Sequence, residues 1–559
     1  MTPPAKKSIA KKRRSRAAAT GSPAAAGSQR RARGGGAPSG PRGWWRAVVE
    51  RRLLERLGWW LAIATLLLPP FVMLAGIRDP FRLPKSLLAE LLVPLSLVFL
   101  AFGLRRIDRV DGRRILSLPA VRALGPLWVV ALISGLASAH SEHSLEAMWS
   151  LSIGVAAVIA WSVALPRKRR ALDLMLIPGV ALAVIAVLQH HEIFRPFELA
   201  RATGRIQMSS LAGNVADLGA YLVLPLLIAQ AGAMRALAAG RKPLFAGTIL
   251  VALLLLYALL LGQTLSALAA AFAASALFWL LRAPRRWRVL LVVGTLAVGV
   301  VGLLLVEPVR KRVANKVREV RAGRLNDVLT GRLDGWRTGV DMLARNPLLG
   351  VGPGAYRAEF APTKLAMIEE GETFWWGHTD GSLFINAHNE PIELAAELGG
   401  LGLLALGWCV VVVLGELRRR PLSPVDAPGG APGGAGTGGA GAAGSKTAVG
   451  RSSKGKSTLG KSALGKSLAK SRARDRLAAG ALVAAADRRA LEWSGLVALA
   501  VLSMTYFPLR TALVAYPYLL LLSWVLEPSR GLDAIGETEG SAAAGSAAGS
   551  PTGREEVAA

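Results

Sequence analysis

Long apolar stretches alternate with short polar loops along most of the chain. Runs of about 20 apolar residues, enough to cross the ~30 Å hydrocarbon core of a bilayer, recur from Trp59 almost to the end of the sequence. The pattern predicts twelve membrane-spanning helices, at residues 59–77, 87–104, 121–139, 145–165, 171–189, 213–232, 243–262, 264–282, 288–306, 392–414, 491–509 and 511–526. We therefore expect an all-α polytopic integral membrane protein.

Lysine and arginine gather in alternate loops. Four basic loops fall on one side of the predicted bundle, at residues 105–114, 166–170, 235–242 and 282–288. Because positive charge is retained in the cytoplasm during insertion, this side is predicted to be cytoplasmic. All six histidines and a long loop, residues 307–391, then lie outside. The first outer loop, with Arg78, Arg82 and Lys85, is an exception to the charge rule.

Composition divides the chain into seven segments. These are a disordered basic cytoplasmic arm (1–57), spans one to nine (58–306), the outer loop (307–391), span ten (392–415), a Gly/Ala/Lys-rich cytoplasmic linker (416–490), spans eleven and twelve (491–527) and a disordered cytoplasmic tail (528–559). The formal net charge is +32, and the arm alone holds fifteen Lys or Arg against two Glu. No folded nucleic-acid-reading motif accompanies this charge, so we expect the arm to contact anionic membrane lipids and expect no nucleic-acid partner.

The linker contains a misleading motif. Gly455–Ser462 satisfies the phosphate-loop pattern G-x-x-x-x-G-K-[ST], and so does Gly460–Ser467. A working phosphate loop follows a strand and opens a helix, whereas this one lies among Gly-rich and Lys-Ser-Leu-Gly repeats. We interpret the match as a product of low complexity.

The outer loop is predicted to be mostly helical. Valines at 309, 313, 317 and 320 recur at helical spacing while basic residues fill the other face, which is typical of an amphipathic helix on a membrane surface. A second helix is predicted to begin at Gly331-Arg332, with Trp336, Val340 and Leu343 as its apolar stripe, and to end at Asn346-Pro347. The glycines of Gly350–Gly354 then predict a chain reversal.

The loop ends in a second, sharper motif. His388-Asn389 is followed by nine residues and then by Gly399-Gly400-Leu401-Gly402, which fits H-[NSQ]-x9-G-x-x-G across a helix entry. Together with G-R-x-x-x-W at 331–336 and the glycine turn, this order of motifs resembles the O-antigen ligase and polymerase family. An R-x-x-G segment at 201–204 followed by Asn214 extends the resemblance, although the usual Pro before the Asn and a Ser-Arg pair near Ser266 are missing.

The resemblance implies a metal-independent membrane glycosyltransferase of GT-C-like architecture that needs no cofactor. Such an enzyme transfers a glycan from undecaprenyl diphosphate to an acceptor hydroxyl at the periplasmic face of the bacterial inner membrane, in lipopolysaccharide or polysaccharide biosynthesis. The acceptor would be lipid A core, another glycan or a protein. Ligase and polymerase share the donor chemistry, so the sequence leaves both open.

The resemblance also assigns roles to particular residues. A neutral imidazole can take the proton of an attacking hydroxyl, and His388 is the predicted base. Arginines hold a diphosphate with charged, bidentate donors, and the predicted ones are Arg332, Arg201 and Arg205. The predicted supporting residues are Asn389, Glu397, Asn214, Trp336 and Trp376.

A flippase or transporter of lipid-linked oligosaccharides is the alternative from another class. Transporters carry ionisable groups at the bilayer midplane and repeated broken helices, whereas the polar residues here are concentrated in one asymmetric loop. Metal catalysis is not favoured, because His140 and His143 lie in a different loop from His190 and His191. The single cysteine, Cys409, excludes an intrachain disulfide.

Overall fold

The computed structural model of the chain describes residues 41–77, 79–103, 115–194, 208–305, 307–374, 384–419, 484–504, 506 and 508–528. It comprises two compact units, residues 1–50 and residues 51–559, and the site described below belongs to the second. Within the described residues every regular element is a helix. The expected all-α fold is confirmed.

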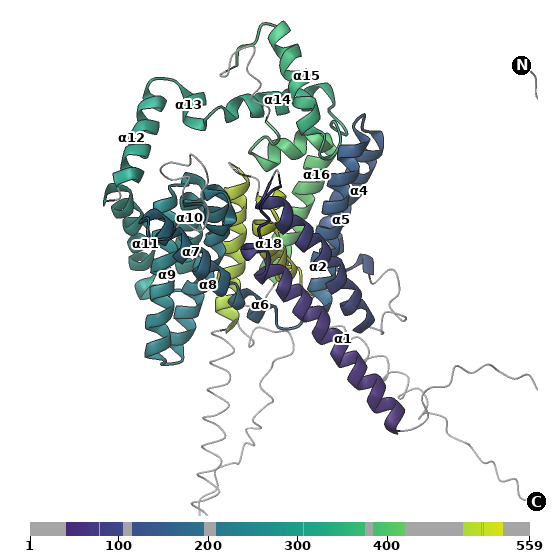
Figure 1. Ribbon diagram of the computed structural model, residues 1–559, viewed down its shortest axis with the longest axis vertical. Helices are drawn as coiled ribbons and strands as arrows, with labels where there is room; N and C mark the ends of the chain where they lie inside the picture. Colours follow the sequence, from purple (N-terminus) through teal and green to yellow (C-terminus); the bar gives the residue numbers. More distant parts are fainter. Residues whose placement is uncertain are drawn as a thin grey trace, which may run out of the picture. The chain divides into compact units, whose positions relative to one another are not determined.

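The helices that matter for the site are shown in Figure 1. Their bounds are α1 Pro41–Leu67, α2 Arg82–Gly103, α4 Pro119–Ala137, α5 Ser141–Ala164, α6 Lys168–Leu174, α7 Leu176–His190, α8 Val215–Ala238, α9 Lys242–Gly262, α10 Leu265–Arg282, α11 Arg285–Leu305, α12 Glu307–Arg321, α13 Leu325–Leu329, α14 Arg332–Arg345, α15 Tyr356–Glu369, α16 Glu390–Arg419, the 3-10 turn η6 Pro508–Arg510 and α18 Ala512–Val525. Residues 484–503 are also helical.

Eight segments among the described residues are long and apolar enough to cross a membrane, and α18 is a shorter apolar helix. The chain is thus a polytopic membrane protein, while the number of twelve spans stays a prediction. Helix α1 corrects one boundary, because it begins at Pro41, inside the segment predicted to be a disordered arm. Proline is favoured in the first turn of a helix, and no further Gly or Pro interrupts the sequence between residue 44 and Gly58.

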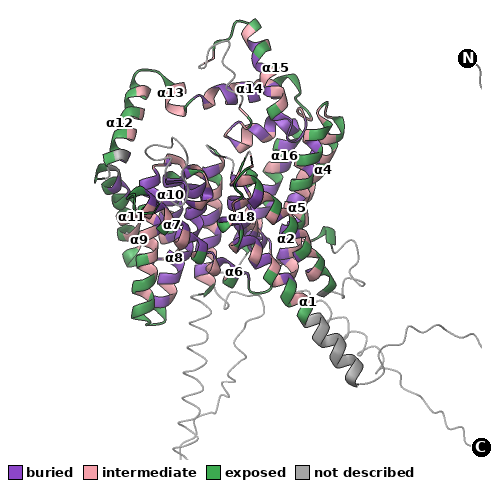
Figure 2. Ribbon diagram, in the orientation of Figure 1, coloured by how far each residue is buried: buried purple, intermediate pink, exposed green. Residues whose placement is uncertain are grey.

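Helix α8 lies at the centre of the bundle. It contacts α7, α9, α10 and α18, and Figure 2 shows it almost entirely in the colour of buried residues. A helix that is apolar on all sides must be surrounded by other helices, and small residues such as Gly219 allow α10 to approach closely. The first turn of α8 is therefore held in a fixed position.

Helices α12 to α15 form the outer loop at one end of the bundle (Figure 1). Helix α14 begins and ends as predicted, but its buried face does not follow the predicted apolar stripe. Val340 is 55% exposed, whereas Gly335, Thr338, Gly339 and Met342 are buried. The physical reason is close approach, because a Cβ at Gly339 would lie 2.9 Å from the side chain of Ile392 on α16.

A kink in α16 explains the glycines of the motif. The helix is interrupted at Gly399, where φ is 66° and ψ is −162°, a conformation that essentially excludes other residues. The break leaves two carbonyl groups without hydrogen-bond donors from the helix. The predicted glycine turn provides the donors: Val351 N–H donates to Ala396 O (3.0 Å) and Gly352 N–H to Glu397 O (2.9 Å). Gly350, at φ 67°, allows this approach, because a Cβ there would overlap those same carbonyls. The two glycine motifs thus form one docking joint.

Candidate functional site

His388 stands in the turn that leads into α16. Its backbone adopts a φ of 55°, a left-handed conformation that costs roughly 1–2 kcal/mol for a residue with a Cβ. Its Nδ1 lies 3.0 Å from the carbonyl oxygen of Asn386. Because a carbonyl can only accept, Nδ1 must carry the proton, and Nε2 of the neutral ring is left as the basic nitrogen.

The surroundings of His388 keep its ring neutral. Phe384 contacts the ring edge to face, with centroids 5.9 Å apart. Burial lowers the pKa of His388, and the positive charges of Arg332 and Arg82 lower it further, against the raising effects of the Asn386 hydrogen bond and of Glu393. Both arginines therefore act on the imidazole from other elements, α14 and α2.

Arg332 is the first residue of α14. It follows Gly331, which takes a φ of 79°, so the helix starts abruptly at the arginine. Asn326 holds this start in place, because its side chain accepts a hydrogen bond from Leu333 N–H (3.2 Å) and donates one to Asp334 (2.6 Å). The predicted base and one predicted diphosphate ligand thus lie in the same region.

Arg82 is a site residue that sequence reasoning missed. Its Nε and Nη2 donate to the two carboxylate oxygens of Asp217, at 2.9 and 3.0 Å, and Tyr506 also donates to this carboxylate. The Asp217 side chain is 2% exposed while that of Arg82 is 39% exposed. The buried carboxylate of Asp217 therefore holds the partly exposed guanidinium of Arg82 in place. The sequence did hold a hint of this role, because Arg82 and Lys85 lie in a predicted outer loop, where the charge rule expects few basic residues.

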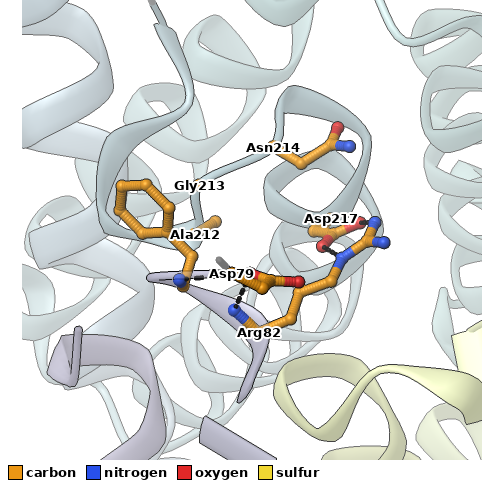
Figure 3. Close-up of a pocket in the computed structure, with 7 residues that line it drawn as sticks. Asp79, Arg82, Ala212, Gly213, Asn214 and Asp217 are labelled. Carbon is orange, nitrogen blue, oxygen red and sulfur yellow. Dashed lines mark hydrogen bonds and ion pairs between the residues drawn. The ribbon is translucent and has the colours of Figure 1, made fainter. Parts of the chain in front are cut away.

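A cavity of about 200 Å³ opens beside this ion pair (Figure 3). It is lined by Asp79, Phe81, Arg82, Ala212, Gly213, Asn214 and Asp217. Asp79 accepts hydrogen bonds from the N–H groups of Phe81 and Arg82, and the buried Lys85 amine donates to the carbonyls of Val72 and Phe81. The loop that leads into Arg82, the first residue of α2, is thereby fixed.

The predicted supporting residues have structural partners. Asn214 caps α8 through a 2.7 Å hydrogen bond from Ala216 N–H. Asn389 accepts from Ile392 N–H and donates to the carbonyl of Met504, so both ends of its amide are engaged. Trp336 packs against a cluster that includes Tyr356 and Ala387 and supports the turn before His388.

A network of charged side chains contacts the turn that carries His388. Glu397, a predicted supporting residue, accepts a 2.7 Å hydrogen bond from Arg510, which also pairs with Glu393 at 2.8 Å. Glu393 in turn accepts from Asn386 Nδ2 and from Ala387 N–H, each at 2.9 Å. Sequence reasoning missed Glu393 and Arg510, since they lie outside the motif's defining positions.

Three predicted residues, Arg201, Arg205 and Trp376, lie outside the described residues. Among the residues that are described, no group of three His, Cys, Asp or Glu side chains is arranged to hold a metal. Three other histidines have protein partners: His140 lies 2.7 Å from Glu359, His143 lies 3.0 Å from Arg357, and His191 lies 3.1 Å from Tyr257.

Comparison with known protein families agrees with the motifs. Residues 250–407 match the family model described as O-antigen ligase. The chain carries an O-antigen ligase domain. Over residues 250–407, the match confirms the expected resemblance to the O-antigen ligase and polymerase family. No curated protein matches the chain.

The O-antigen ligase domain contains Arg332, the glycine turn, His388 and the kink of α16. Arg82, Asp217 and Arg510 fall outside it. Arg82 acts electrostatically on His388 and Arg510 pairs with Glu393 and Glu397 inside the domain, while Asp217 binds Arg82. The site therefore combines a family domain with residues from helices on either side of it in the sequence.

Proposed function

We propose that the protein is an O-antigen ligase-type glycosyltransferase. It would transfer a glycan from undecaprenyl diphosphate to the hydroxyl of an acceptor such as lipid A core, at the periplasmic face of the inner membrane. The observation that carries this proposal is a neutral imidazole, His388, whose tautomer is fixed by Asn386 and whose surroundings include two arginines, Arg332 and Arg82.

The reaction follows from these groups. The acceptor hydroxyl oxygen attacks the anomeric carbon of the donor sugar and passes its proton to His388 Nε2. The bond between the anomeric carbon and the phosphate oxygen breaks, and its electron pair leaves with undecaprenyl diphosphate. A general base of this kind contributes about 10²–10⁴-fold to the rate.

Arginines are suited to the leaving group because charge develops on the diphosphate as the bond breaks. Arg332 and Arg82 supply permanent positive charge near the base, and Arg201 and Arg205 are proposed to join them. Trp376 is proposed as a face on which a sugar ring stacks. None of these steps requires a metal.

The same donor chemistry serves a polymerase, which differs in its acceptor. Purified protein in proteoliposomes, supplied with one lipid-linked glycan, tests both: lipid A core, a second lipid-linked glycan and a protein acceptor are offered in turn. We expect one acceptor to be extended, as detected by gel shift and mass spectrometry.

The decisive variant is His388→Ala, which should lose about 10²–10⁴-fold of the transfer rate while still binding the donor. His143→Ala is the matched control, since that histidine lies in the first turn of α5 and pairs with Arg357. Transfer that survives the loss of His388 would contradict the proposal, and lipid translocation without transfer would indicate a flippase.

A further inference from the structure

The carboxylate of Glu393 forms hydrogen bonds with the turn that carries His388. Glu393 lies in the first turns of α16 with its side chain 3% exposed. One of its oxygens accepts from the Asn386 amide and from Arg510, and the other accepts from Ala387 N–H. It therefore grips the two residues immediately before the histidine.

Residues 503–510 brace this arrangement from a distant part of the sequence. Arg510 pairs with both Glu393 and Glu397. In the same segment, Ser503 and Leu509 N–H donate to Glu390 (2.8 Å each), and the Met504 carbonyl accepts from Asn389. Every one of these contacts reaches the first turns of α16 or the residue just before it.

We propose that Glu393 and Arg510 form a positioning unit for His388. Glu393 fixes the Asn386–Ala387 backbone so that the Asn386 carbonyl meets Nδ1 of the ring, and Arg510 holds Glu393 in place. Neither residue touches the reacting atoms. The role assigned to His388 rests on the proposed function, whereas the positioning itself is a property of the fold.

Two physical arguments support this assignment. A residue with a Cβ stays in the left-handed region only when its surroundings over-determine it, and Glu393 supplies two of the bonds that do so. Buried carboxylates need a counterion, and Arg510 serves Glu393 and Glu397 together. Removing Arg510 would leave two acids facing each other without a cation.

Glu393 also acts on the ring electrostatically. Among the described residues, the charged groups that act on His388 are Arg332 from α14 and Arg82 from α2, which lower its pKa, and Glu393 from α16, which raises it. Glu393→Gln removes the negative charge and leaves the positive ones. The pKa of His388 should therefore fall.

The test reads His388 directly, without any glycan substrate. Diethyl pyrocarbonate modifies neutral imidazole, so the pH dependence of labelling at His388, followed by mass spectrometry of its peptide in the full-length protein, reports when the ring loses its proton. We expect Glu393→Gln to move the midpoint to lower pH. Arg345→Ala, which breaks an exposed pair with Asp341 and Glu370, should leave it unchanged.

Transfer kinetics supply the second readout. Arg510→Met should lower kcat at least tenfold with little change in KM for the donor, and Arg510→Lys should restore most of the rate because it keeps the cation. If Glu393→Gln does not yield folded protein, the comparison of Arg510→Met with Arg510→Lys tests the positioning role. An unchanged labelling midpoint, or equal rates for Arg510→Met and wild type, would overturn the positioning role.

The two proposals fail in different ways. A shifted midpoint with no transfer to any acceptor by the wild type would refute the proposed function and leave the positioning unit intact. Transfer by the wild type with an unmoved midpoint in Glu393→Gln would refute the positioning unit alone.

Discussion

The guanidinium of Arg82 forms two parallel hydrogen bonds with the carboxylate of Asp217, across 135 residues of sequence. Such a fork is rigid, so Arg82 is oriented before any substrate arrives. Asp217 sits on the first turn of the central helix α8 and gains a further hydrogen bond from Tyr506. The beginnings of α2 and α8, which are far apart in the chain, are thereby joined, and Arg82 is close enough to His388 to act on its charge.

Weakening this fork should weaken donor binding. Asp217→Asn replaces the charged anchor by a neutral amide, and we expect KM for the lipid-linked donor to rise about tenfold, the equivalent of 1.4 kcal/mol. Arg235→Lys is the control, because Arg235 pairs with Asp173 near the other end of the same helix. A donor KM that does not respond to Asp217→Asn would exclude Arg82 from the diphosphate site.

The pH profile of transfer should reflect His388. The ring acts as a base in its neutral form, so the rate falls as the pH drops through its pKa. Since burial and two arginines lower that pKa, the acid limb should lie below the ordinary histidine value of about 6.5. Arg332→Gln removes one positive charge and should move the limb to higher pH, as measured from kcat/KM; a limb that stays in place would contradict the electrostatic contact.

Replacing the glycine at the kink should destabilise the whole joint. Gly399→Ala forces a Cβ into a conformation that costs about 1–3 kcal/mol and into the backbone of Leu348. We expect a clear fall in the apparent melting temperature in detergent. Gly407→Ala on the same helix meets nothing within 4 Å and should be neutral or slightly stabilising; equal effects of the two variants would argue against the joint.

The phosphate-loop match in the linker should be without function. Lys461→Ala, alone or with Lys466→Ala, should leave the transfer rate unchanged, and transfer should need no added ATP. Rates are measured in the same proteoliposome assay with His388→Ala as the inactive reference. A loss of activity on removal of Lys461 would restore the nucleotide-binding interpretation.

Local patterns in the sequence predicted much of this molecule. Apolar runs predicted the membrane helices, and the positions of Gly331, Asn346 and the glycine turn predicted where α14 begins, where it ends and where the chain reverses. These features depend on neighbouring residues alone. The motif around His388 pointed to the family whose model matches residues 250–407.

The remaining features depend on contacts between distant segments. Nothing near Val340 in the sequence indicates that α14 buries its glycines and leaves Val340 exposed. The buried face is determined by the close approach of Ile392 on another helix. Arg82 and Asp217 are 135 residues apart, and Arg510 reaches Glu397 across 113 residues. Pairings of this kind have no local signature, although the misplaced charge of Arg82 was a usable hint.

Residues 503–510 bear on when the His388 turn becomes ordered during synthesis of the protein. The brace on the His388 turn comes from residues that the ribosome adds more than a hundred positions after the histidine itself. A nascent polypeptide that has been synthesised only as far as the Gly/Ala/Lys-rich linker would already contain all the family motifs. Its His388 turn would still lack the contacts from residues 503–510. Catalytic competence would then be acquired late, during insertion of the final helical hairpin.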